Sequence, residues 1–116
     1  MKIFIITFIA FFGLLQVKPL TEKQKINLLV SYVEQLKDAK FIRNGSEHTC
    51  KEAANHLKLK LKNAGDEIKT AKQFIQELAT KSSLTGKPYE ILLPNGKKVK
   101  SETFFLEKLK EIESKQ

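Results

Sequence analysis

The stretch that decides the fold is Thr49-Cys50-Lys51-Glu52-Ala53-Ala54-Asn55-His56-Leu57-Lys58-Leu59-Lys60-Leu61-Lys62. Its last six residues alternate strictly between leucine and lysine, and this periodicity alone predicts a half-buried strand. Leucine and lysine are good helix formers, however, and an apolar stripe continues into these residues from Cys50. Thr49 and Glu52 have the spacing of a capping box. We therefore predict a helix that begins at Ser46 or Thr49.

Further helices are predicted on both sides of this stretch. Thr21 and Gln24 form a second capping box ahead of apolar residues spaced three and four apart, so we expect a helix over residues 22–39. The polar residues 43–46 break the pattern, and Gly65 is suited to end the second helix. A third helix is expected from Asp66 or Thr70 to residue 79.

The C-terminal part contains the only expected strands. Residues 89–93 and 98–100 flank the turn residues Pro94-Asn95-Gly96, which predicts a short hairpin. Ser101 is expected to cap a last helix with Phe104, Phe105, Leu109 and Ile112 on its inner face. The predicted fold class is thus mainly α, a small single-domain helical protein of about four helices with a short β-hairpin before the last helix.

Residues 1–18 are typical of a secretory signal peptide, because Lys2 precedes an apolar run over residues 3–15 and a polar break begins at Gln16. The cleavage site is left open, since Leu15-Gln16-Val17 offers no small residue. An uncleaved inner-membrane anchor is the alternative, although a membrane span needs about 20 apolar residues. We expect a periplasmic protein whose residues 19–116 form one small globular domain.

The charge of the chain favours anionic partners. The net charge is +8, and 19 basic and 13 acidic residues remain after residue 18. An exported basic domain is expected to meet a protein partner or an anionic envelope component, while nucleic acid is disfavoured by the compartment. Lys58, Lys60 and Lys62 are predicted to form a solvated face, with a polyanion contact as the secondary interpretation. No cofactor is expected.

Cys50 is the only cysteine, so no intramolecular disulfide is available. A thiol in the first turn of a helix is driven toward the thiolate by the helix dipole, and His48 lies nearby in sequence. This pair suggests a thiol-dependent enzyme or redox sensor. Cys50 also belongs to an apolar stripe, however, and catalysis needs an orienting group and an oxyanion site that the sequence does not identify. A buried structural thiol is therefore favoured.

The same segment offers weak metal ligands and one arginine. His48, Cys50, Glu52 and His56 match no usual zinc spacing, and His56 lies about 240° around a helix from Cys50, so no metal site is expected. Arg43 is the only arginine. It is interpreted either as a clamp on a carboxylate or phosphate or, preferably, as an internal salt bridge to a nearby glutamate, Glu47 or Glu52.

The sequence Phe41-Ile42-Arg43-Asn44-Gly45-Ser46-Glu47-His48-Thr49-Cys50, with the later segments 71–75 and 82–89, resembles the YfeK-like family of small exported bacterial proteins. The resemblance implies a periplasmic or envelope address and no assigned activity. We expect a non-enzymatic binding or interaction module, with the thiol enzyme as the alternative. The candidate binding surface consists of Arg43, Asn44, Glu47, His48, Cys50, Glu52 and His56.

Overall fold

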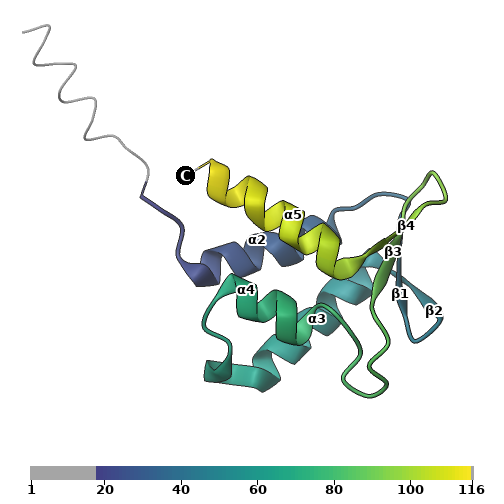
Figure 1. The fold of residues 1–116 in the computed structure, drawn as a ribbon, viewed down its shortest axis with the longest axis horizontal. Helices are drawn as coiled ribbons and strands as arrows, with labels where there is room; N and C mark the ends of the chain where they lie inside the picture. Colours follow the sequence, from purple (N-terminus) through teal and green to yellow (C-terminus); the bar gives the residue numbers. More distant parts are fainter. Residues whose placement is uncertain (1–17, 116) are drawn as a thin grey trace, which may run out of the picture.

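The computed structural model describes residues 18–115, in which four α-helices and a four-stranded antiparallel sheet form a fold of mixed α and β structure (Figure 1). The predicted leader lies outside the described residues except for Lys18. The elements are, in chain order, α2 (Glu22–Glu34), β1 (Lys40–Arg43), β2 (Ser46–Thr49), α3 (Cys50–Ala64), the 3-10 turn η2 (Gly65–Glu67), α4 (Ala71–Gln73), the π-helical turn η3 (Phe74–Leu78), β3 (Glu90–Leu92), β4 (Lys98–Lys100) and α5 (Ser101–Ser114). None of the helices in residues 18–115 combines the length and the apolar character needed to cross a membrane.

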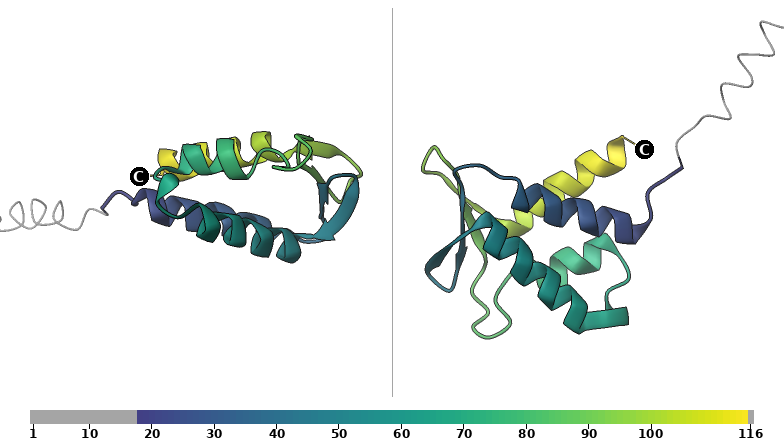
Figure 2. Two further views of the ribbon diagram at one scale, coloured as in Figure 1. Left: turned by 90° about the horizontal axis from the view of Figure 1, so that it is seen from below. Right: turned by 180° about the vertical axis from the view of Figure 1, so that it is seen from behind.

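The helices form two layers that the sheet joins at one end. Figure 2 shows α2 beside α3 in one layer and α4 beside α5 in the other, with the strands closing the end opposite the start of α2. The sheet is antiparallel throughout, in the order β2-β1-β3-β4. One continuous core fills the space between the layers and includes Leu29, Leu57, Phe74 and Phe105, all fully buried.

The mainly helical prediction with a single hairpin was wrong, because β1 and β2 form a second hairpin where only a polar break was expected. Asn44 and Gly45 connect these strands with φ angles of 53° and 81°. Two successive positive φ angles form the turn whose twist matches that of antiparallel strands, and Asn-Gly is its preferred sequence. β2 contains no aliphatic residue, so hydrophobic alternation gave no signal for it.

The predicted helix starts are confirmed at Thr21, Thr49 and Thr70, which all form capping boxes. The Leu-Lys repeat is helical, as composition predicted. The first helix is shorter than expected, since α2 ends at Glu34. The third expected helix is divided between α4 and η3.

The hairpin of β3 and β4 is confirmed, but the role predicted for Ser101 was wrong. Ser101 is the first residue of α5 rather than its N-cap, and Lys100 precedes it without a side-chain cap. The Ser101 side chain is fully buried, and its Oγ donates to the carbonyl oxygen of Ala79 at 2.8 Å. This hydroxyl therefore ties the start of α5 to the chain after η3.

A charged network joins the first, third and last helices. The Glu22 carboxylate accepts a hydrogen bond from the Ala71 backbone N–H at 2.8 Å and pairs with Lys25 Nζ at 2.9 Å. The same ammonium group pairs with Glu113 at 3.0 Å. The Ala71 hydrogen bond, followed by the hydrogen bond from Lys25, lowers the pKa of Glu22. Ionised Glu22 thus holds α2 against the start of α4.

This network makes a pH-dependent contribution to stability. A carboxylate whose pKa is lowered by folding stabilises the folded state above its unfolded pKa, about 4.3 for glutamate, and loses that contribution as the pH falls through the folded value. We expect Glu22→Gln to lower the melting temperature at pH 7, with the difference from the wild type shrinking by pH 3. Thermal unfolding followed by circular dichroism at both pH values measures this.

The matched control is Glu67→Gln, which removes an exposed carboxylate outside the network. It is expected to leave the melting temperature unchanged at both pH values. A difference between Glu22→Gln and wild type that stays constant from pH 7 to pH 3 would show that the ionised carboxylate is not what stabilises the contact.

Candidate functional site

The candidate site forms where the β1–β2 hairpin faces the first turns of α3. Alternate residues of a strand point to opposite faces of the sheet, and Phe41 is paired with His48, so these two side chains share the inner face with Arg43. On α3, Glu52 and His56 are spaced four apart and therefore lie on one side of the helix. The two elements enclose a cavity of about 220 Å³, lined by Phe41, Arg43, His48, Glu52, Ala53 and His56.

Arg43 and His56 are in direct contact across this cavity. Arg43 Nη1 lies 3.3 Å from His56 Nε2. Burial, followed by the positive charges of Arg43, Lys60 and His48, lowers the pKa of His56 and favours the neutral ring. Because a guanidinium group only donates, Nε2 is the acceptor and the ring proton is assigned to Nδ1. The imidazole thus positions the arginine without neutralising its charge.

The internal salt bridge preferred for Arg43 is not formed, since Arg43 takes part in no ion pair within residues 18–115. Glu52 instead accepts a hydrogen bond from the Thr49 backbone N–H at 2.9 Å in the capping box. This bond is the main reason for the lowered pKa of Glu52. Glu47 lies away from this cavity and lines a separate hollow with Asn44. The arginine charge is left available to a ligand.

Cys50 is directed into the core and does not line the cavity. Its side chain is 4% exposed, and its Sγ donates to the Ala39 carbonyl oxygen at 3.5 Å. Burial raises the pKa of the thiol, and this effect outweighs the opposing charge of Lys40. The position at the start of a helix therefore does not produce a reactive thiolate.

The prediction missed Lys60, Tyr89 and Ser82, which enclose a second cavity on the other side of Arg43 and His56. This cavity measures about 140 Å³ and is lined by Arg43, Asn44, His56, Lys60, Ser82, Ser83, Leu84 and Tyr89. Lys60 had been assigned to a solvated face, yet it lies one helical turn after His56, and this spacing was visible in the sequence. The approach of Ser82 and Tyr89 depends on long-range packing and had no local signal.

Lys60 is held in place by the chain around Tyr89. Its Nζ donates to the Leu78 carbonyl oxygen at 2.8 Å and to Tyr89 Oη at 3.2 Å, and it lies 5.1 Å from the centre of the tyrosine ring. Burial, followed by the Arg43 charge, lowers the pKa of Lys60. Burial raises the pKa of Tyr89, so the phenol keeps its proton at neutral pH.

The segment between η3 and β3 closes this second cavity. Ser82 Oγ accepts hydrogen bonds from the backbone N–H groups of Leu84 and Thr85 at 3.2 and 3.3 Å. Thr85 Oγ1 donates to Asn44 Oδ1 at 2.5 Å, which links this segment to the turn of the β1–β2 hairpin. The candidate residue Asn44 therefore holds the segment between η3 and β3 in place beside the second cavity.

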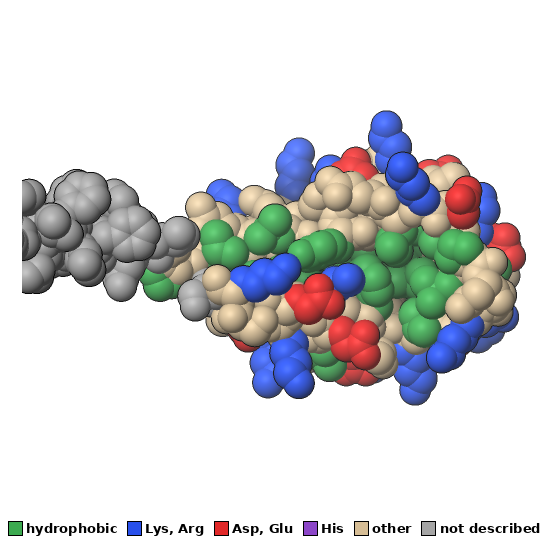
Figure 3. Space-filling model, turned by 90° about the horizontal axis from the view of Figure 1, so that it is seen from above, with side chains coloured by type: hydrophobic (Ala, Val, Ile, Leu, Met, Phe, Trp, Pro, Cys, Tyr) green, Lys and Arg blue, Asp and Glu red, His purple; other side chains and the backbone are tan. Residues whose placement is uncertain are grey.

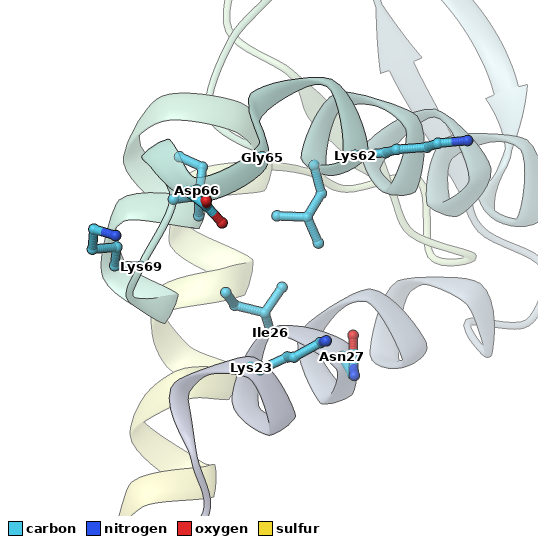
Figure 4. A pocket seen from close by; sticks show the side chains of 9 residues that line it. Lys23, Ile26, Asn27, Lys62, Gly65, Asp66 and Lys69 are labelled. Carbon is cyan, nitrogen blue, oxygen red and sulfur yellow. The ribbon is translucent and has the colours of Figure 1, made fainter.

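Other surface features lie apart from the two cavities on either side of Arg43 and His56. A cavity of about 330 Å³ between α2 and the end of α3 contains none of the candidate residues. Lys62 is among the residues that line it, and Figure 4 shows them. Figure 3 shows a band of hydrophobic side chains across another face, where no histidine is visible. No group of three or more His, Cys, Asp or Glu side chains in residues 18–115 is arranged to hold a metal ion.

The buried thiol makes a direct prediction. We expect iodoacetamide to modify Cys50 in the folded protein far more slowly than in denaturant at every pH up to 8, because the thiol is both shielded and protonated. Mass spectrometry of timed samples measures the rates. Rapid modification of the folded chain at pH 7, as shown by activated thiols with pKa values of roughly 3.5–7.5, would contradict this assignment.

Comparison with known proteins supports the predicted resemblance. The model of a family of unknown function, DUF5329, matches residues 20–113. The chain is 50% identical over 68 residues to the uncharacterized protein YfeK of Salmonella typhimurium (strain LT2), and the match covers 59% of this chain. It spans 57% of the length of that relative. No solved structure matches the chain significantly.

Proposed function

We propose, for a chain that belongs to the DUF5329 family of unknown function, a non-enzymatic role as a binding module of the bacterial cell envelope. The binding surface is the hairpin corner, defined as the residues of β1, β2 and α3 that line the cavity of about 220 Å³. Its partner is a protein or envelope component that presents an anionic group to Arg43.

The observation that carries this proposal is the convergence of Arg43, His48, Glu52 and His56 on one cavity. These residues come from three elements, and packing of a hairpin against a helix brings them together. The arginine enters the cavity without an acidic partner, and a partly buried cation of this kind favours a ligand that supplies the missing charge. A guanidinium group is well suited to carboxylate and phosphate oxygens.

The chemistry of the corner favours binding over catalysis. A thiol nucleophile needs access and a lowered pKa, whereas Cys50 is buried and its pKa is raised. Burial, followed by the Arg43 charge, lowers the pKa of His56 and favours its neutral ring, and its Nε2 already accepts a hydrogen bond from Arg43. The groups that remain at the corner can hold and orient a ligand by charge and hydrogen bonds.

The envelope location is part of the proposal and is supported by the composition of residues 1–18, in which an apolar run follows Lys2 and precedes a polar break. A net charge of +8 for the whole chain also suits a compartment bounded by anionic lipids and polymers.

Photocrosslinking in living cells tests the binding role. A photoreactive amino acid is placed at His48, which lines the cavity, in the full chain expressed with its leader. We expect a discrete crosslinked product in the periplasmic or envelope fraction, reduced roughly tenfold by Arg43→Gln. A hydrogen bond to a charged group is worth about 1.5–3 kcal/mol, which sets the scale of this loss.

The same photoreactive group at Glu77, an exposed residue of η3 outside the corner, is the positional control and is expected to give no such product. Thermal unfolding of Arg43→Gln checks that the fold is kept. Identical products from both positions, or a product insensitive to Arg43→Gln in a folded protein, would overturn the proposal.

A further inference from the structure

The second cavity is lined by residues of β1, α3 and the segment that precedes β3, and its charge differs from that of the other cavities. Arg43, His56 and Lys60 all line it, and its lining includes no aspartate or glutamate. Each of the other three cavities introduced above is lined by at least one carboxylate. This hollow therefore has the lining expected of an anion site.

The two cations of the cavity lack a counter-charge within the described part of the chain. Arg43 and Lys60 are both half-buried, and neither takes part in an ion pair. Burial and the Arg43 charge both oppose the protonated form of Lys60. Bringing two cations together away from water is unfavourable unless something compensates them, and a bound anion would supply that compensation.

Hydrogen-bond donors also remain available in this cavity. Lys60 Nζ uses two of its three protons, on Leu78 and Tyr89. The Tyr89 hydroxyl accepts from Lys60, so its own proton is free to be donated. Ser82 Oγ accepts two backbone hydrogen bonds and likewise retains its proton. Three uncommitted O–H or N–H protons thus belong to residues that line one small space with a guanidinium group.

We infer that this cavity binds a phosphate group, held by Arg43 and Lys60 with hydrogen bonds from Tyr89 and Ser82. The assignment rests on the proposed binding function, because Arg43 and His56 line both cavities, and it names the chemical class of the anionic group that reaches Arg43 from the side of the second cavity. Inorganic phosphate, a soluble phosphate ester and a phospholipid headgroup share this chemistry.

Geometry favours phosphate over carboxylate. The donors come from three directions, namely from β1, from α3 and from the segment after η3, and a tetrahedral group has oxygens to meet all three. A volume of about 140 Å³ is below the roughly 300–1,000 Å³ of pockets that enclose whole drug-sized ligands. The rest of a larger ligand would leave past Leu84, which is 92% exposed at the rim.

Titration followed by NMR tests the assignment. Inorganic phosphate and glycerol 3-phosphate are added to the ¹⁵N-labelled protein at constant ionic strength, with acetate as the planar anion. With phosphate we expect saturable chemical-shift changes at Ser83 and at the His56 ring. The affinity for acetate, measured from the same signals, is expected to be at least tenfold lower. Binding should also raise the pKa of His56, because the anion offsets the neighbouring positive charges.

A matched pair of variants separates this site from general charge attraction. Lys60→Gln and Lys62→Gln remove the same charge from the same helix, but only Lys60 lines the cavity. We expect Lys60→Gln to weaken phosphate binding at least tenfold and Lys62→Gln to leave it within about twofold. If Lys60→Gln does not fold, Tyr89→Phe replaces it and is expected to weaken binding severalfold.

Vesicles distinguish the sources of the phosphate. Binding to phosphatidylglycerol vesicles that is weakened by Lys60→Gln, with no shift from the soluble compounds, would support a lipid headgroup, whereas shifts from the soluble compounds support a free phosphate or ester. Equal affinity for acetate, equal loss in both lysine variants, or no response to any phosphate probe would overturn the assignment. If the crosslink from His48 persists in that case, only the ligand class fails; if phosphate binds and the crosslink is absent, the partner-binding role fails.

Discussion

The strand register of β1 is the constraint on which the site depends. Phe41 is paired with His48 of β2 and with Ile91 of β3. Because side chains alternate between the two faces of a strand, this pairing decides which side chains of the β1–β2 hairpin face the core. A shift of the β1 register by one residue would move the side chains of both Phe41 and Arg43 to the outer face of the sheet. The burial of Phe41, which is 2% exposed, therefore also fixes Arg43 against α3. Packing energy in the core thus positions a charge at the surface.

This arrangement leaves Arg43 and Lys60 without an ion-pair partner in the described part of the chain. Lys25, a buried cation, lies between Glu22 and Glu113 and ties the helices together. Arg43 and Lys60 contact a histidine, a carbonyl oxygen and a phenol instead. Lys25, which is paired with two carboxylates, therefore belongs to a structural network. Arg43 and Lys60 have no ion-pair partner in the described residues, and we therefore propose that they bind a ligand.

The starts of α2, α3 and α4 could be predicted from sequence because capping boxes and apolar spacing are local, as at Thr49. The start of α5 has no side-chain cap, so its capping residue was predicted wrongly. The first hairpin was missed although Asn44-Gly45 carried the signal, since β2 has no apolar alternation to support it. Arg43, His48, Glu52 and His56 were found through their clustering in the chain. Tyr89 and Ser82 were not assigned to the site, because nothing local indicates that a segment some thirty residues away folds against α3.

The central claim is that Arg43 and Lys60, which have no ion-pair partner in the described residues, surround a neutral His56 ring in the second cavity. The titration of His56 in the free protein tests this most directly. The account predicts by NMR a pKa below the ordinary value of about 6.5, and a rise toward that value in Lys60→Gln, with burial and Arg43 left in place. A wild-type His56 that titrates at or above the ordinary value would contradict the account.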